Sequence, residues 1–240
     1  MYYRRFRRVG IKIVAISRGI QEKFLQLGFS QNYILVAPDG VDIEQFSISL
    51  TKEECRKELQ LPMDKKLVVY TGHLYSWKGV ETLADAAKSL DDRFRVIVVG
   101  GSADDTTRYA KQYADCSLVV FLGQQPHRLM PMYLKAADIL VLPNSNKEAI
   151  SNTYTSPLKM FEYMASGRPI LASELPSIRE ILTEEMAYFV HPNDPEALAR
   201  GIRDAALHTE ESERKASRAL REVARYSWAS RARSILEFVA

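Results

Sequence analysis

The sequence predicts an α/β protein built on a parallel β-sheet with helices on both faces. Apolar, β-branched runs recur along the chain from about residue 67, and segments of helical character separate them. Such an alternation of strand and helix is typical of a parallel sheet. The runs are apolar and β-branched, as expected for strands that helices cover on both faces.

The regular part of the chain is expected to contain six strands and at least seven helices. The strands are predicted at 67–71, 95–100, 118–123, 138–143, 169–173 and 187–190. The helices are predicted at about 79–90, 104–114, 128–136, 156–166 and 177–182, followed by two or three amphipathic helices after residue 190. The strands end in Gly, Pro or small residues. Their carboxyl ends therefore open into loops, where sheets of this class bind ligands.

The first 50 residues do not follow this rhythm. A strand is predicted at 11–17, a helix at 16–28 and a second strand at 32–38. Residues 38–46 then form a predicted linker with turn chemistry at Asp39-Gly40. So short a strand–helix–strand unit cannot bury both of its faces alone. We expect it to be the last unit of a larger domain whose earlier part is absent.

Composition narrows the class of protein. A chain of 240 residues with 46% hydrophobic residues can bury one good core, or one core and a smaller attachment. Its formal net charge of +3 is too small to imply nucleic-acid binding. No apolar run reaches the ~18 residues of a membrane span, and no signal peptide begins at Met1. Cys55 and Cys116 lie far apart and outside any CxxC motif, which favours a reduced, cytoplasmic setting.

Four arginines at positions 4, 5, 7 and 8 are interleaved with Tyr2, Tyr3 and Phe6. Such a segment could rest on an acidic membrane surface, which would place the protein peripherally at the inner membrane face, or on a partner protein. The alternative is a frayed helix end with solvated arginines.

The stretch 156–180, SPLKMFEYMASGRPILASELPSIRE, is the most informative part of the sequence. Ser156 is a preferred N-cap and Pro157 suits the first helical position, while Gly167 is the expected left-handed stop. A helix that opens beside the carboxyl ends of parallel strands is a natural phosphate cradle. Glu162, about a turn and a half further in, would lie near a ribose and accept its hydroxyl protons. The stretch therefore predicts a nucleotide site.

Several landmarks in order resemble the carboxyl-terminal two-thirds of a family-4 glycosyltransferase of the GT-B fold. They are AISRGIQEKFLQLG, VAPDGVDIEQF, YTGHLYSWKGVETLADAA, VVFLGQQP, YLKAADILVLP, the stretch 156–180 and HPNDPEALARGI. The resemblance implies two facing Rossmann-like domains, of which the first binds the acceptor and the second the sugar nucleotide. It divides the chain into a remnant of the first domain with a linker (1–45), the nucleotide-sugar-binding domain (46–222) and a helix crossing back to the first domain (223–240).

The resemblance also implies roles for residues after the first strand of the donor domain. Gly72 would let backbone approach the diphosphate, and Lys78 would neutralise the diphosphate as it leaves. The family usually has an arginine where His73 stands. Histidine is mostly neutral at pH 7, so this phosphate contact would be weaker. The alternative for Lys78 is an ordinary surface lysine.

Further roles follow from the same resemblance. Glu162 matches the second glutamate of a characteristic pair and would hold the ribose; the alternative is an exposed helical carboxylate. The helix start over the phosphates and donor sugar comprises Ser156, Pro157, Leu158 and Lys159. The first glutamate of the pair is replaced by Tyr154, and Glu148 lies nearby but out of register. Transfer chemistry is therefore less firmly implied than nucleotide binding.

The remaining candidates are weaker. Backbone groups of Gly123 and Gln124 could hold the base, or serve only as a strand-end turn. His127, His191 and His208 are expected to be ordinary loop or surface histidines. No cluster of His, Cys, Asp or Glu has metal-ligand spacing, so we expect no metal and no cofactor beyond the donor nucleotide sugar.

The resemblance therefore implies a retaining, metal-independent transferase that moves a sugar from a nucleotide diphosphate sugar to an acceptor hydroxyl. Its acceptor would be a saccharide or lipid-linked saccharide, as in polysaccharide assembly. One alternative is a donor-nucleotide-binding module that needs a separate acceptor domain. Another is a structural or membrane-docking remnant that binds no nucleotide.

Overall fold

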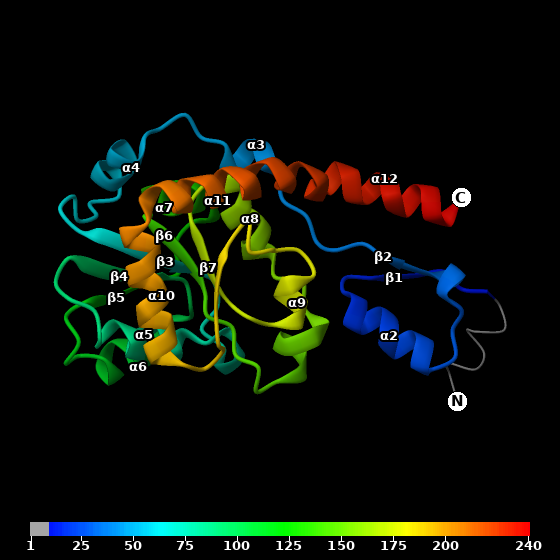
Figure 1. Cartoon of the computed structure of the whole chain (residues 1–240), viewed down its shortest axis with the longest axis horizontal. Coiled ribbons are helices and arrows are strands. Elements are labelled where there is room, and N and C mark those ends of the chain that lie inside the picture. Colours follow the sequence, from blue (N-terminus) through cyan, green and yellow to red (C-terminus); the bar gives the residue numbers. More distant parts are fainter. Residues whose placement is uncertain (1–9) are drawn as a thin grey trace.

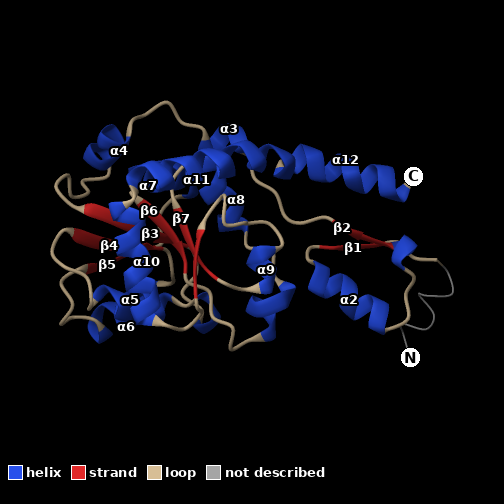
Figure 2. Ribbon diagram, in the orientation of Figure 1, coloured by secondary structure: helices blue, strands red, loops and turns tan. Residues whose placement is uncertain are grey.

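The protein is built around a six-stranded, fully parallel sheet, seen in a computed structural model that describes residues 10–240 (Figures 1 and 2). Its strands are β3 (Lys66–Thr71), β4 (Phe94–Val99), β5 (Val119–Gly123), β6 (Ile139–Leu142), β7 (Ile170–Ser173) and β8 (Tyr188–Val190). All six predicted strands are therefore confirmed, with small differences at their ends. The arginine-rich segment lies outside the described residues.

The strand order is β5-β4-β3-β6-β7-β8. The first three strands, β3, β4 and β5, are thus added one beside the next. The chain then crosses to the other edge of β3, where β6, β7 and β8 follow in order. This order gives a topological switch point between β3 and β6, where Val68 pairs with Ile139 and Val69 with Leu140. In open α/β sheets the crevice beyond the carboxyl ends of such a pair is the preferred ligand site.

Two cores lie on opposite faces of the sheet, because successive side chains of a strand point to opposite sides. Leu67 and Val69 of β3 face one core, and Val68 and Tyr70 face the other. The first core is covered by α7 (Met130–Ala136), α8 (Leu158–Ser166) and α11 (Thr209–Glu222). The second is covered by α5 (Val80–Ala87), α6 (Ala103–Gln112) and α10 (Pro195–Leu207). The predicted α/β class is confirmed.

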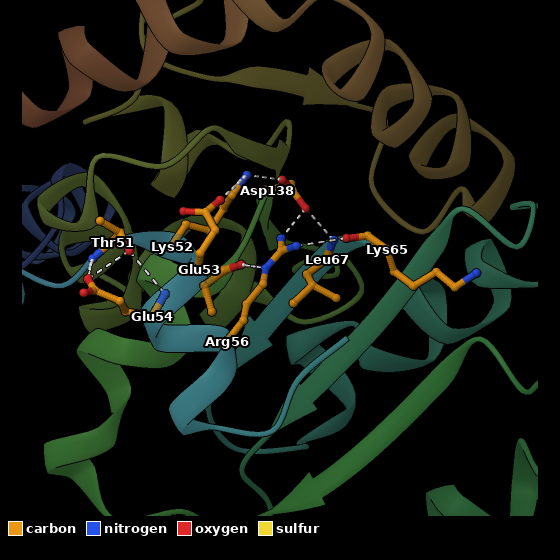
Figure 3. Close-up of polar contacts among 9 residues, drawn as sticks. Thr51, Lys52, Glu53, Glu54, Arg56, Lys65, Leu67 and Asp138 are labelled. Carbon is orange, nitrogen blue, oxygen red and sulfur yellow. Dashed lines mark hydrogen bonds and ion pairs between the residues drawn. The ribbon is translucent and has the colours of Figure 1, made fainter. Parts of the chain in front are cut away.

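Asp138, just before β6, holds the amino ends of the switch-point strands together (Figure 3). Its carboxylate accepts hydrogen bonds from the Leu67 amide at 2.7 Å, from Arg56 at 2.6 Å and from Lys52 at 3.1 Å. Both cations come from α4 (Lys52–Glu58). Burial alone would raise the pKa of Asp138, but the Leu67 amide and the Arg56 and Lys52 charges lower it below its ordinary value.

The sequence analysis did not predict α4, although its signal is present. Thr51 and Glu54 form a capping box in which each side chain bonds the backbone N–H of the other residue. A Thr followed three residues later by Glu is the sequence signature of that motif. Two further short helices are α3 (Ile43–Phe46), in the linker, and α9 (Pro176–Arg179), after β7.

The amino-terminal unit is a two-stranded parallel sheet, β1 (Ile13–Ala15) and β2 (Ile34–Val36), with helix α2 (Arg18–Gln26) beside it. In Figure 1 this unit lies at one end of the molecule, next to the last helix, α12 (Trp228–Val239). The linker after β2 meets the start of α12, where the Val41 amide bonds the Tyr226 carbonyl at 2.9 Å. The boundaries 1–45, 46–222 and 223–240 stay a prediction.

The start of α8 differs from the prediction. The helix begins at Leu158, with Pro157 at the N-cap and no side-chain cap. The Ser156 hydroxyl instead accepts a hydrogen bond from the Asp39 amide at 2.9 Å, so it joins the linker to the sheet domain. Gly167, at φ 64°, ends the helix in the left-handed conformation as predicted. In the described part of the chain, no helix is both long and apolar enough to cross a membrane.

Candidate nucleotide site at the switch point

A cavity of about 920 Å³ opens at the carboxyl ends of β3, β4 and β5. Gly72, His73 and Tyr75 from the loop after β3 line one side of it. The rest of its wall is formed by Val99, Gly100, Gly101, Ser102, Asp105, Gln124, Gln125, Pro126, His127 and Met130. The cavity therefore adjoins β3 of the switch point on the side of β4 and β5, and it has the size that a nucleotide-sized ligand requires. Lys78, Lys159 and Glu162 are not among the residues that line it.

Gly72 brings the backbone and a buried lysine close together. Its φ is +125°, a conformation that residues with a Cβ rarely adopt. A Cβ placed there would also lie 3.3 Å from Nζ of Lys159. The absence of a side chain at Gly72 therefore leaves room between its backbone and the Lys159 ammonium group.

Lys159, in the first turn of α8, is the most unusual charged residue of the site. The residue is 8% exposed, and its Nζ is buried without a hydrogen-bond partner. It lies 3.6 Å from the centre of the Tyr70 ring. Burial, and then the charge of nearby Lys78, holds the pKa of Lys159 well below its ordinary value, while Glu162 acts in the opposite direction. A bound anion would supply the partner that this group lacks.

Lys78 lies near Lys159 at the end of a short 3-10 turn, Ser76–Lys78. Its Nζ lies 3.7 Å from the centre of the Trp77 ring, and burial lowers its pKa to about 8. The next residue, Gly79, has φ 72°, and a Cβ there would come within 1.8 Å of the Pro143 carbonyl oxygen. The loop after β3 is thus fixed tightly against the end of β6.

Glu162 lies one turn further along α8, with its side chain 20% exposed. Burial raises its pKa, although His127 and Lys159 pull it down. Nε2 of His127 lies 3.8 Å from the Glu162 carboxylate. The Glu162 carboxylate and the His127 ring thus face each other, at the place where α8 and the loop after β5 approach the cavity.

These residues fall within a known family. The family of group 1 glycosyl transferases matches residues 51–223, which is more than half of the chain. The chain belongs to this family. The resemblance expected from the sequence is confirmed, and so is the class of protein.

Individual glycosyltransferases agree with this assignment. The chain is 30% identical over 192 residues to TuaC of Bacillus subtilis, which is named as a teichuronic acid biosynthesis glycosyltransferase; the match covers 79% of this chain and 45% of TuaC. It is 26% identical over 219 residues to a D-inositol 3-phosphate glycosyltransferase of Corynebacterium urealyticum, with 85% and 50% of the two chains covered. The chain spans about half the length of these curated relatives.

The fold is that of solved glycosyltransferases with GT-B architecture. A glycosyltransferase of Rickettsia africae superimposes with a TM-score of 0.84 at 21% identity, over 98% of this chain and 65% of that one. HepE of Anabaena, solved in complex with UDP, gives a TM-score of 0.82 at 21% identity, over 95% and 63%. At this level of identity the likeness shows the fold alone.

Of the site residues predicted for this group 1 glycosyl transferase, the structure brings four together. Gly72, Lys78, Lys159 and Glu162 form one connected group around the switch point. Ser156 faces the linker, and Leu158 is 49% exposed at the helix start. His73 and Gln124 line the cavity, whereas Gly123 does not; its carbonyl accepts the Gly100 amide at 2.7 Å.

Two residues of this glycosyltransferase were missed or misjudged in the sequence. His127 was expected to be an ordinary loop histidine, yet it lines the cavity beside Glu162. Asn144, two positions after β6, is fully buried with neither of its side-chain polar atoms bonded. The sequence feature that could have pointed to Asn144 is a polar residue shortly after a buried strand of the sheet. Buried, unpaired amides are uncommon, so each one calls for an explanation.

Tyr154 and Glu148, the residues that depart from the family's glutamate pair, lie on one irregular segment. Tyr154 ends a π-helical turn, Ile150–Tyr154, just before Ser156. The Glu148 carboxylate accepts a hydrogen bond from the Ser76 hydroxyl at 3.0 Å. Glu148 is therefore tied to the loop that carries Lys78.

Proposed function

We propose that this chain binds a nucleotide diphosphate sugar at the switch-point cavity. We further propose that it transfers the sugar to an acceptor hydroxyl, with retention of configuration and without a metal ion or further cofactor. One observation carries the proposal: a buried, unpartnered Lys159 ammonium beside Lys78, at the carboxyl edge of β3. A diphosphate would neutralise both groups. The complexes of HepE with UDP and with UDP-glucose support a donor of this class.

The chemical task assigned to these residues is to stabilise the departing diphosphate. Lys78 and Lys159 would supply positive charge to the diphosphate in a poorly hydrated site, where preorganised charge is most effective. Glu162 accepts the hydroxyl protons of the ribose and so fixes the reacting carbon in place. With two lysines at the diphosphate, the site has a source of positive charge in its own side chains. Within residues 10–240, no group of three His, Cys, Asp or Glu side chains is arranged to hold a metal ion.

The proposal is tested by calorimetric titration and thermal unfolding with UDP, GDP and ADP. We expect one nucleotide to bind, and at 100 times its dissociation constant to add about 2.7 kcal/mol to the free energy of unfolding. Lys78→Ala and Glu162→Ala should remove most of this gain. Lys111→Ala, on the exposed surface of α6, is the matched control and should retain it. A folded protein that binds none of the three nucleotides would contradict the proposal.

A second candidate function is a donor-binding module that turns over only with a separate acceptor domain. It is favoured by exposed apolar side chains on the amino-terminal unit and on α12, namely Ile11, Leu25, Tyr33, Leu236 and Val239. Such a surface is expected where a partner covers it. Donor hydrolysis and transfer assays on the nucleotide-bound chain distinguish the two: nucleotide binding without turnover favours the module.

A further inference from the structure

The His127 ring, which lines the cavity, is contacted by two residues of the linker. Nδ1 of the ring lies 3.1 Å from the side-chain nitrogen of Gln45, a residue 82 positions earlier in the chain. The ring also packs edge-on against Phe46, with ring centres 6.3 Å apart and planes at 82°. Gln45 and Phe46 are the last two residues of α3. The linker therefore reaches the wall of the proposed nucleotide site.

Helix α3 is itself fixed in place. The Asp42 carboxylate accepts a hydrogen bond from the backbone N–H of Gln45 at 3.2 Å, which caps the start of the helix. Phe46 is 4% exposed and packs in the first core. The Gln45 side chain thus extends from a fixed part of the backbone. A contact made from such a point holds the His127 ring at a small cost in conformational entropy.

The contact with Gln45 determines which nitrogen of a neutral His127 ring carries the proton. A glutamine side-chain nitrogen can only donate a hydrogen bond, so Nδ1 of His127 accepts one and carries no proton. In the neutral ring the proton then lies on Nε2. Nε2 is also the nitrogen that lies 3.8 Å from the Glu162 carboxylate. Gln45 therefore makes His127 present a hydrogen-bond donor beside the acceptor Glu162.

The spacing of this donor and acceptor fits a bound hydroxyl group. At 3.8 Å, the distance from Nε2 to the Glu162 carboxylate is too long for a direct hydrogen bond. An oxygen atom about 2.8 Å from each of the two atoms can bond to both. A hydroxyl meets this requirement, because it accepts one hydrogen bond and donates another. A phosphate or carbonyl oxygen could accept from His127 but has no proton to give to Glu162.

We propose that His127 is a second ligand of the nucleotide ribose. Its Nε2–H donates to the same hydroxyl whose proton Glu162 accepts, and Gln45 is the positioning residue that fixes this tautomer. The inference rests on the proposed function, which places the ribose at Glu162. A ligand in the cavity can reach the ring, because the His127 side chain is 65% exposed and lines the wall. The pair selects a ribonucleotide over a deoxynucleotide, since loss of the hydroxyl leaves donor and acceptor unbonded.

The selectivity is measured by calorimetric titration with UDP, 2′-deoxy-UDP and 3′-deoxy-UDP, or with the same series of GDP or ADP if one of these binds instead. We expect one deoxy nucleotide to bind about ten-fold more weakly than its parent. His127→Ala should weaken the parent about three- to ten-fold and leave the affinity for that deoxy nucleotide almost unchanged. His127→Gln should recover part of the loss, because its side-chain nitrogen can also donate. His208→Ala, at an exposed histidine outside the cavity wall, is the control.

The role of Gln45 is measured from the ring-nitrogen chemical shifts of His127 in the unliganded protein at pH 8, assigned by comparison with His127→Ala. We expect Nε2 to carry the proton. Gln45→Leu keeps a side chain of similar size but cannot donate. It should give a mixture of the two tautomers and a lower affinity for the parent nucleotide. Glu44→Gln, at an exposed position of the same helix, should change neither quantity.

The proposal is overturned if the neutral His127 ring carries its proton on Nδ1, if Gln45→Leu leaves the tautomer unchanged, or if both deoxy nucleotides bind as tightly as their parent. It is also overturned if His127→Ala weakens the parent and the deoxy nucleotide equally, because the ring would then contact another part of the ligand, or if it weakens neither. Failure of UDP, GDP and ADP to bind the wild type is a different result. It would contradict the proposed donor site itself, and the ribose contact would be excluded with it.

Discussion

The burial of the Lys159 ammonium group is expected to lower the stability of the unliganded protein and to favour the binding of a nucleotide. Its ammonium is buried with no hydrogen-bond partner, at the point where a diphosphate is proposed to lie. We expect Lys159→Met to raise the free energy of unfolding of the unliganded protein by about 1–3 kcal/mol, since an unsatisfied buried polar group is removed. The same change should abolish the stabilisation by nucleotide. Urea unfolding with and without UDP measures both effects.

The matched control is Lys111→Met on exposed α6, which should leave both quantities unchanged. A loss of stability in unliganded Lys159→Met would mean that the contact with the Tyr70 ring outweighs the cost of burial.

Deprotonation of Lys78 is expected to have opposite effects on the stability of the unliganded protein and on its affinity for nucleotide. Burial lowers its pKa from 10.5 to about 8. Between these values the unfolded chain holds a proton that the folded chain has lost, so the unliganded protein should gain stability as the pH rises from about 8 to 10.5. Nucleotide binding favours the charged lysine, so affinity should fall as the pH rises above about 8. Calorimetric titrations at pH 7, 8 and 9.5 check this.

Lys78→Arg provides the control for that titration, because a guanidinium keeps its charge over this range. Any pH dependence that remains in the variant then comes from groups other than Lys78, with Lys159 among them. A wild-type affinity that is constant from pH 7 to 9.5 would contradict the assigned role of Lys78.

At the same scale, the resemblance to the family's motifs pointed to Gly72, Lys78, Lys159 and Glu162, because these motifs are short stretches that can be recognised in the sequence. His127 and Asn144 could not be found in this way. His127 reaches Glu162 only because the loop after β5 folds over α8. The burial of Asn144 depends on the loop that packs beyond β6. Both facts depend on contacts between distant segments.

At the scale of elements, the network around Asp138 fixes α4 to the switch-point strands (Figure 3). Asp138→Ala leaves the Arg56 guanidinium, 5% exposed, without its carboxylate. We expect a loss of about 3–5 kcal/mol, as when one partner of a buried ion pair is removed. The exposed pair Arg93–Asp91, with side chains 74% and 43% exposed, is the control. Asp91→Ala should have little effect on unfolding by urea.

The same network predicts acid sensitivity. The pKa of Asp138 is lowered in the folded protein, so its contribution to stability is complete above the ordinary value of 3.8 and is lost as the pH falls below it. Asp138→Asn should therefore lose less stability than the wild type between pH 5 and pH 2. Equal losses in the two proteins would show that other carboxyl groups account for the acid sensitivity.

The start of α8 shows why local rules failed at one element. Serine is a good N-cap, and Ser156 precedes a proline suited to the first turn. Yet the Ser156 hydroxyl is engaged by the Asp39 amide, a residue more than a hundred positions earlier. A capping rule weighs only neighbouring backbone amides, so it cannot anticipate a competing donor from the linker.

At the scale of the whole molecule, the amino-terminal unit is docked through the start of α2. The Glu180 carboxylate accepts from the Arg18 amide at 2.8 and 3.0 Å, and the Ser17 hydroxyl donates to the Thr153 carbonyl at 3.1 Å. Gly19 allows this approach, because a Cβ there would lie 2.5 Å from the Thr153 carbonyl oxygen. The docked segment thus contacts the π-helical turn that leads into the proposed donor site.

We expect Gly19→Val to separate the amino-terminal unit from the sheet domain while the six-stranded sheet stays folded. In hydrogen exchange, amides of 11–37 should lose protection and those of β3 and β4 should keep it. Lys23→Ala, on the exposed side of α2, is the control. Loss of protection throughout the chain would instead mean that the two parts unfold as one cooperative unit.

The sequence by itself determined the α/β class, the places of the six strands and the family, and its motifs indicated the lysines and glutamate of the proposed donor site. These follow from periodicity, turn residues and short motifs, which are local. Only the tertiary structure decided that Lys159 is buried without a hydrogen-bond partner, that Glu148 is bonded to Ser76 and that Ser156 binds the linker. Burial and pairing depend on which distant segments pack together, and that is set by the balance of the whole core rather than by any single stretch of the chain.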